Sequence, residues 1–246
     1  MRLLKSCAGT CIAGALLLSS TCPTQDDFFP PPLEAPVFAD ITAGAVRQGG
    51  RYHPSLCMTW SPPAQDSNQV DYYSILRNAV NFSDTLFSIA RHSIPGSITS
   101  YCDRIDQFGF PKESIKKISY RICTLDTAGQ SGDTSQTDTF FLAVPPRLRR
   151  PAIDDTLTEN YFEWSMRGVF GQYRTFMLFW NSSGLLWQST PDSTYGNEKN
   201  DVFTAALPDS LYNSLTGDTC FWGVKIEALS LPYQESIDIR SVYVSK

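Results

Sequence analysis

The sequence of 246 residues offers few side chains in a pattern that could catalyse a reaction. Its two histidines, His53 and His92, stand apart in predicted loops, where nothing in the sequence supplies an acid–base partner. Carboxylate pairs at residues 26–27 and 154–155 could serve a glycosidase, but adjacent side chains on an extended chain point in opposite directions. The sequence also lacks the Gly-x-Ser-x-Gly, P-loop and His-Glu-x-x-His motifs. We predict that the protein is not an enzyme; an enzyme with an unrecognised site is the second alternative below.

The sequence also gives no support for a metal, cofactor or nucleic-acid site. Asp66, Asn68 and Asp71 have oxygen ligands at calcium-loop spacing, but the glycine and the terminal glutamate of such a loop are missing, so we assign them to a turn. The cysteines do not have the close paired spacing of a zinc site. A formal charge of −5, a pI near 5.0 and the lack of a long basic run argue against nucleic-acid binding. We expect no metal and no cofactor.

Residues 1–22 have the pattern of an export signal. Arg2 and Lys5 precede a small and apolar stretch, residues 6–18, which is too short to cross a bilayer as a helix. The segment Leu18-Ser-Ser-Thr-Cys22 resembles a bacterial lipobox, and this resemblance implies that Cys22 carries lipid. It departs from the lipobox because the leucine stands four places before the cysteine and a threonine directly precedes it. Secretion without lipid is therefore the alternative.

A proline-rich segment over residues 23–35 follows, and its composition predicts a stiff, extended tether. We expect an exported protein that is lipid-anchored to the cell membrane or the outer membrane. No other segment is long and apolar enough to span a membrane.

Two segments of similar length, residues 36–145 and 146–246, make up the rest of the chain. Proline-bounded residues 145–151 separate them as a predicted linker. Both segments contain short runs rich in β-branched and aromatic residues, broken by Gly, Pro, Asn, Asp and Ser. The fold class predicted is all-β, with two tandem antiparallel β-sandwiches after the signal peptide and tether.

The first segment resembles a fibronectin type III domain. The runs LCMTWSPP, DYYSILRN and YRICTLDTAGQSGDTS correspond to the family's second, third and sixth strands. The resemblance implies that Trp60 and Tyr120 are the family's core aromatics. It also implies that Tyr120 forms a tyrosine corner, bonding back to the loop before it.

The second segment is similar to a divergent fibronectin- or immunoglobulin-like sandwich. Its second strand contains Trp164, and in the run beginning at Cys220 the side chains of Trp222, Val224 and Ile226 share one face. We predict that Trp164 and Trp222 lie in its core. A different all-β sandwich of the same size is the alternative.

From these strand assignments, our hypothesis is that Cys57 and Cys102 form a disulfide. Both cysteines fall on neighbouring strands of one sheet and point outward if Met58 and Tyr101 point inward. Cys123 points outward from the opposite sheet, and a disulfide needs Cα atoms within about 7 Å. We expect Cys123 and Cys220 to be unpaired.

One strand of the second segment, residues 173–180, is apolar on both faces. Phe176, Leu178 and Trp180 share the face that a single sandwich would not bury, and Trp187 is a candidate to join it. Its cover could be the first sandwich, a partner protein or a sugar ring. We name these four residues the candidate interaction face.

These features predict a non-catalytic cell-envelope lipoprotein that acts as a protein-binding or spacer module. An envelope protein is the expected partner, and a glycan is possible. The first alternative is a carbohydrate-binding accessory protein. The fold alone does not decide between them, because sandwiches serve many functions.

Overall fold

The computed structural model describes residues 32–64, 69–81, 86–108, 115–166, 170–197, 201–217, 219–229 and 234–244. The signal peptide with Cys22 and most of the tether, and also Asp66 and Asn68 of the turn, lie outside these residues.

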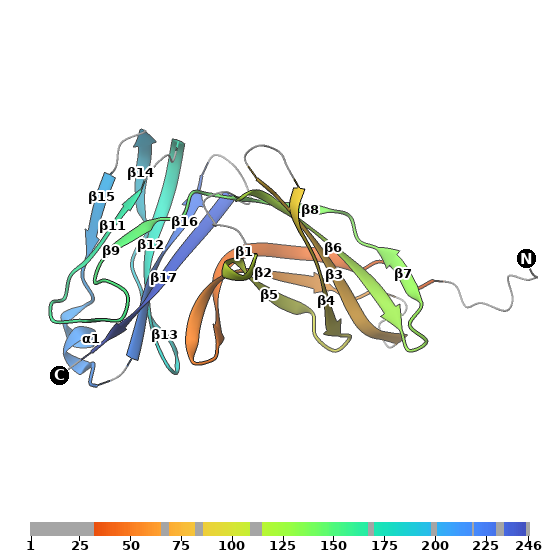
Figure 1. The fold of residues 1–246 in the computed structure, drawn as a ribbon, viewed down its shortest axis with the longest axis horizontal. Coiled ribbons are helices and arrows are strands. Elements are labelled where there is room, and N and C mark those ends of the chain that lie inside the picture. Colours follow the sequence, from red (N-terminus) through yellow and green to blue (C-terminus); the bar gives the residue numbers. More distant parts are fainter. Residues whose placement is uncertain are drawn as a thin grey trace, which may run out of the picture. The chain divides into compact units, whose positions relative to one another are not determined.

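The first half of the described chain is a sandwich of two antiparallel sheets (Figure 1). One sheet has the order β1-β2-β5, and the other contains β4-β3-β6-β8, with β7 paired to β6. The elements are β1 (Val37–Gln48), β2 (Arg51–Ser61), β3 (Val70–Asn81), β4 (Leu86–Pro95), β5 (Ser100–Arg104), the 3₁₀ helix η3 (Ile105–Gln107), β6 (Ile115–Asp126), β7 (Ser131–Thr134) and β8 (Asp138–Leu142).

Alternation along the strands builds the core of this sandwich. On β2, Met58 and Trp60 point inward, and on β3 Tyr73 and Ile75 do so, while the residues between them are more exposed. Trp60 and Tyr73 meet edge to face with ring centroids 5.2 Å apart. Tyr120 of β6 is fully buried in the same core.

The second half forms another two-sheet sandwich. One sheet has the order β15-β11-β9 and the other contains β13-β12-β16-β17, with β14 paired to β12 and β10 paired to β17. The elements are β9 (Arg147–Arg150), β10 (Asp155–Thr156), β11 (Phe162–Met166), β12 (Phe170–Asn181), β13 (Gly184–Gln188), β14 (Asp192–Asn197), β15 (Asp201–Ala205), α1 (Asp209–Ser214), β16 (Thr219–Ala228) and β17 (Gln234–Tyr243). The predicted all-β class, with its sheets forming sandwiches, is confirmed.

The core of the second sandwich is aromatic. Phe162 and Trp222 are fully buried with ring centroids 5.3 Å apart, and Trp164 is 5% exposed. A separate set of buried residues therefore fills each sandwich, one around Trp60 and Tyr120 and one around Trp164 and Trp222.

Residues 145–151, which we predicted to be a linker, belong instead to the second sandwich. Residues 147–150 form β9 and pair antiparallel with β11. The pattern Arg147-Leu148-Arg149 places the leucine in the core at 2% exposure and leaves both arginines exposed. The flanking prolines are compatible with a short edge strand, which needs few backbone donors.

Candidate functional site

The candidate interaction face is covered largely by the first sandwich. Trp180 is 6% exposed and Leu178 7%, and both belong to the hydrophobic cluster that fills the first sandwich. The ring of Tyr52, on β2, stacks on Trp180 with centroids 5.6 Å apart and meets Phe221 edge-on at 5.3 Å. For Leu178 and Trp180, the alternatives in which a partner protein or a sugar ring covers this face are therefore wrong.

The other two predicted members, Phe176 and Trp187, do not complete one surface with them. Phe176 is half-buried on β12. Trp187, on β13, lies opposite Phe179, which is fully buried in the second core, so its ring packs on that core. A register shift between Phe179 and Trp180 places Trp187 on the inner side, and the sequence pattern did not show it.

Polar contacts join the two sandwiches beside these aromatic rings. Strands β8 and β17 pair in parallel, Leu142 opposite Glu235, and the Ala143 amide donates to the Glu235 carbonyl oxygen at 3.0 Å. The Glu235 carboxylate accepts from the Ala43 amide at 2.8 Å and lies 3.0 Å from Lys225 Nζ. Desolvation lowers the pKa of Lys225, but its hydrogen bonds and charge interactions with two glutamates outweigh this and raise it. We call Tyr52, Trp180, Phe221 and Glu235, with these partners, the joint.

A buried charge cluster lies inside the first sandwich. Arg77 Nη1 donates to both carboxylate oxygens of Asp103 at 2.9 Å, and the Tyr120 hydroxyl donates to Asp103 Oδ2 at 2.9 Å. The Arg77 guanidinium also lies 3.8 Å from the centre of the Phe108 ring. Burial and the negative charge of Asp103 raise the pKa of Tyr120 well above its ordinary value.

This cluster changes the expected role of Tyr120. Tyr120 bonds to the side chain of Asp103, which lies within β5, whereas the resemblance implied a bond to the loop before Tyr120. Arg77 comes from the facing sheet, so the cluster ties the two sheets together across the core. Because Arg77 and Asp103 are about 5% and 2% exposed, the cluster has no access to a substrate and acts as a structural contact.

Each histidine has a carboxylate nearby, which sequence reasoning missed. His53 Nδ1 lies 3.0 Å from Asp106 Oδ2 and His53 Nε2 lies 3.3 Å from the Gln48 carbonyl oxygen. Desolvation raises the pKa of Asp106, but hydrogen bonds from Arg104 and His53 lower it below its ordinary value. His92 Nε2 lies 3.7 Å from Asp103 Oδ1. These contacts present no hydroxyl or thiol to either ring as a nucleophile would require.

The four cysteines that the structure describes divide into one disulfide and two thiols. Cys57 and Cys102 lie directly opposite each other on β2 and β5, with Cα atoms 4.0 Å apart, and form a disulfide. Cys123 is a half-buried thiol whose sulfur lies 2.9 Å from Ser131 Oγ, and Cys220 is a buried thiol.

In the described part of the chain, no group of three or more His, Cys, Asp or Glu is placed to hold a metal ion. Nor does any helix there have the length and apolarity to cross a membrane.

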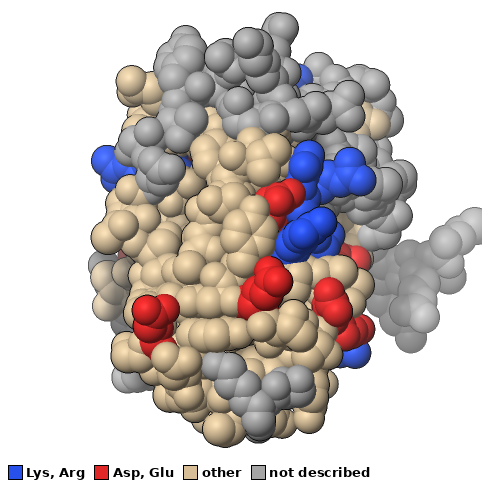
Figure 2. Space-filling model, turned by 90° about the vertical axis from the view of Figure 1, so that its left-hand side faces the viewer, with Lys and Arg blue, Asp and Glu red and all other residues tan. Residues whose placement is uncertain are grey.

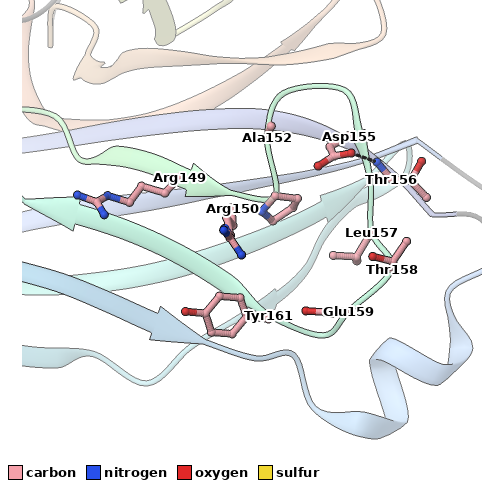
Figure 3. Close-up of a pocket in the computed structure, with 10 residues that line it drawn as sticks. Arg149, Arg150, Ala152, Asp155, Thr156, Leu157, Thr158, Glu159 and Tyr161 are labelled. Carbon is pink, nitrogen blue, oxygen red and sulfur yellow. Dashed lines mark hydrogen bonds between the residues drawn. The ribbon is translucent and has the colours of Figure 1, made fainter.

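A pocket of about 430 Å³ lies at the edge of the second sandwich, beside β9. The chain crosses from β9 in one sheet to β10 in the other through residues 151–154 and returns to β11 through residues 157–161. The space between these two crossings is the pocket, shown in Figure 3. Figure 2, seen from the side of β15 and β11, shows a main group of basic side chains with acidic side chains close by, and a few more charged side chains toward the edges of this face.

Local hydrogen bonds fix the walls of this β9 pocket. Asp154 has φ 57°, and its amide and carboxylate both bond to Ser241 of β17. The Leu157 amide donates to the Tyr243 carbonyl at 2.7 Å. The Asn160 side chain bonds both the amide and the carbonyl of Leu207 at 2.8 Å. The walls are therefore held by the rest of the sandwich.

The lining of the β9 pocket combines a buried floor with separated charges. Pro151 and Leu157 are buried, and Tyr161 is 38% exposed. In Figure 3 Arg150 lies between the residue 151–155 crossing and Tyr161, while Arg149 extends away. Among the described residues, no hydrogen bond or ion pair engages the Arg150 side chain.

The remaining polar groups of the pocket are partly paired. Arg149 lies 3.4 Å from Glu163, whose other carboxylate oxygen accepts from the Tyr161 hydroxyl at 3.1 Å. Desolvation and this bond raise the pKa of Tyr161, while the positive charge of Arg150 opposes the rise. Asp155 and Glu159 are exposed carboxylates on the rim. The only sequence feature that pointed to this pocket is the group of three arginines in residues 147–150, a segment that we predicted to be a linker.

Comparisons with known proteins concern only the fold. The sequence matches no protein-family model and no curated protein. Similar solved structures include the FN5 domain of Drosophila Lar (16% identity, TM-score 0.29, 45% of this chain and 95% of that chain) and the chicken CNTN1 FN1–FN3 domains (11%, 0.33, 88% and 69%). A third is a β-1,2-glucanase from Parabacteroides distasonis (21%, 0.30, 46%), of which the chain covers only 13%. In each half a three-stranded sheet faces four consecutive strands of the other sheet, to which β7 is added in the first half and β10 and β14 in the second, so each half is a two-sheet β-sandwich.

Proposed function

We propose that the protein is an exported, lipid-anchored module of the cell envelope that binds or spaces other envelope components and performs no chemistry. The sequence supports the anchor through the lipobox-like ending at Cys22 and the proline-rich tether. The observation that carries the proposal is the joint, which combines a stacked aromatic pair, an ion pair and a β8–β17 strand pairing.

The joint favours a spacer or display function because it restricts bending between the sandwiches. A flexible linker lets two domains sample many separations, whereas a shared hydrophobic cluster and a common strand pairing hold one arrangement. The first sandwich follows the tether in chain order, and the second sandwich follows the first. A stiff pair of sandwiches would hold a binding surface of the second sandwich at a set distance from an anchored N-terminus.

Cross-linking in the native envelope, followed by mass spectrometry, tests this proposal. We expect one envelope protein to be recovered repeatedly with the wild-type chain. We also expect the chain to be in the membrane fraction, to incorporate labelled fatty acid, and to lose both properties in Cys22→Ala. A Cys22→Ala chain that stays in the membrane fraction would contradict the anchor, and the absence of any recurrent protein would contradict protein binding.

The alternative function, in which a sugar ring stacks on Trp180, has no structural support, because the Tyr52 ring already stacks on Trp180. Another part of the second sandwich nevertheless has the chemistry of a small-ligand site.

A further inference from the structure

We propose that the β9 pocket binds a sugar unit that carries one carboxylate, with Arg150 pairing with the carboxylate and Tyr161 packing on the sugar ring. This inference goes beyond the proposed function, since it concerns a small-molecule site and needs no lipid anchor and no protein partner.

Arg150 supplies the anionic preference. Among the described side chains, its guanidinium has no hydrogen-bond or ion-pair partner to satisfy its donors. The neighbouring Arg149 differs, because Glu163 lies 3.4 Å from it. A planar guanidinium suits the two oxygens of a carboxylate, and a bidentate pair is stronger than a neutral hydrogen bond. The pocket therefore holds one available cation in a place that a ligand can reach.

Tyr161 and the floor supply the ring contact. The Tyr161 hydroxyl donates to Glu163 at 3.1 Å, which holds the side chain in place, and more than a third of the residue is exposed. Pro151 and Leu157 add a buried apolar floor. The C–H face of a sugar ring is apolar while its edge carries hydroxyls, so it can pack on an aromatic ring and keep polar contacts around it.

The rim selects a ligand with hydroxyl groups and only one negative charge. Asp155 and Glu159 can accept hydrogen bonds from hydroxyls, and Thr156 and Thr158 line the same pocket. These two carboxylates disfavour a phosphate monoester, because one unpaired arginine cannot balance two added negative charges. A simple carboxylate lacks the hydroxyls and the ring that the remaining groups would contact.

The fixed walls reduce the cost of binding. The bonds from Asp154 to Ser241, from Leu157 to Tyr243 and from Asn160 to Leu207 hold both crossings before a ligand arrives. Binding then needs to order few protein groups besides the Arg150 side chain.

The test is a titration of the full chain, labelled for amide NMR, with three probes at equal ionic strength. Glucuronate carries both the ring and the carboxylate, glucose carries only the ring, and acetate carries only the carboxylate. We expect glucuronate to shift the amide signals of residues 150–161 with a Kd of about 1 mM or below. Glucose and acetate should each bind at least tenfold more weakly.

Three variants locate the site. Arg150→Gln keeps a polar side chain but removes its charge, so glucuronate affinity should fall at least tenfold. Arg147→Gln is the matched control, because it removes a charge from the same strand outside the pocket lining, and affinity should stay within twofold. Tyr161→Phe keeps the ring and should stay within threefold.

Several results would overturn the proposal. They are no shift at about 10 mM glucuronate, equal binding of glucuronate and glucose or acetate, and an equal effect of Arg150→Gln and Arg147→Gln. An unchanged amide spectrum in the absence of probe shows that each variant is folded. Because the titration uses no membrane and no partner protein, its failure would leave the anchoring and partner experiments unaffected, and the reverse also holds.

Discussion

Truncation of Tyr52 to alanine tests whether the joint makes the two sandwiches one cooperative unit. Tyr52 contacts Trp180 with ring centroids at 5.6 Å and Phe221 at 5.3 Å, and it belongs to the first sandwich while both partners belong to the second. Each aromatic pair contributes about 0.5–1.5 kcal/mol beyond the buried area. The half-buried position of Tyr52 reduces the burial contribution below the 3–5 kcal/mol of a fully buried aromatic residue. We expect a loss of about 2–4 kcal/mol, mostly from the coupling between the sandwiches.

Calorimetry and tryptophan fluorescence measure this coupling in the full chain. We expect the wild type to melt in one transition and Tyr52→Ala to melt in two, since each sandwich keeps its own core. The Trp180 emission should also shift to longer wavelength as its ring becomes exposed. Tyr72→Ala is the control, because Tyr72 lies on β3 at 43% exposure and should cost well under about 1 kcal/mol. If the two variants melt alike, the joint does not couple the sandwiches and the reasoning is refuted.

Three further predictions concern the first sandwich. Tyr120→Phe removes the hydrogen bond to the charged Asp103, so the free energy of unfolding measured in urea should fall by about 1.5–3 kcal/mol; no change would contradict the buried cluster. The double variant Cys57→Ala with Cys102→Ala opens a disulfide with a sequence separation of 45 and should lose about 2–4 kcal/mol, and a non-reducing peptide map should show the bond in the wild type alone. Burial and the charge of Asp103 raise the pKa of Tyr101 to about 12. Its contribution to stability is therefore fully present below the ordinary tyrosine pKa of about 10 and is lost as the pH rises toward 12. The urea midpoint of unfolding should fall over that pH interval. The fall should be smaller in Tyr101→Phe.

The fold class could be predicted because alternation along a strand is a local property. Met58 and Trp60 on β2, like Trp222 and Val224 on β16, show an apolar face with period two, and the structure buries those side chains. The arginines of residues 147–150 were misassigned to a linker because a strand of four residues is too short to show a period. Flanking prolines strengthened that mistake.

The contacts of the site could not be predicted because they join residues far apart in the chain. Arg77 and Asp103 meet across two sheets, and Tyr52 reaches Trp180 across two sandwiches. No local pattern gives the partner of a side chain that points into another element. The sequence correctly identified an apolar face that needed a cover, but only the packed structure shows that Tyr52 provides it. The β9 pocket depends likewise on where two crossings lie in space.

The strand that carries Tyr52 of the joint is also tied into the first sandwich by a disulfide and by core packing. β2 carries Tyr52 near its start, the disulfide at Cys57 and the core residue Trp60 near its end. The disulfide ties β2 to β5, and β5 also carries Asp103, which bonds to Arg77 of the facing sheet. Through β2 and β5, Tyr52 is therefore linked to covalent and ionic contacts that cross the first sandwich. This continuity from core to joint is what a stiff spacer requires, and it explains why we expect Tyr52→Ala to separate the two unfolding transitions, whereas Tyr120→Phe should lower the stability of the first sandwich itself.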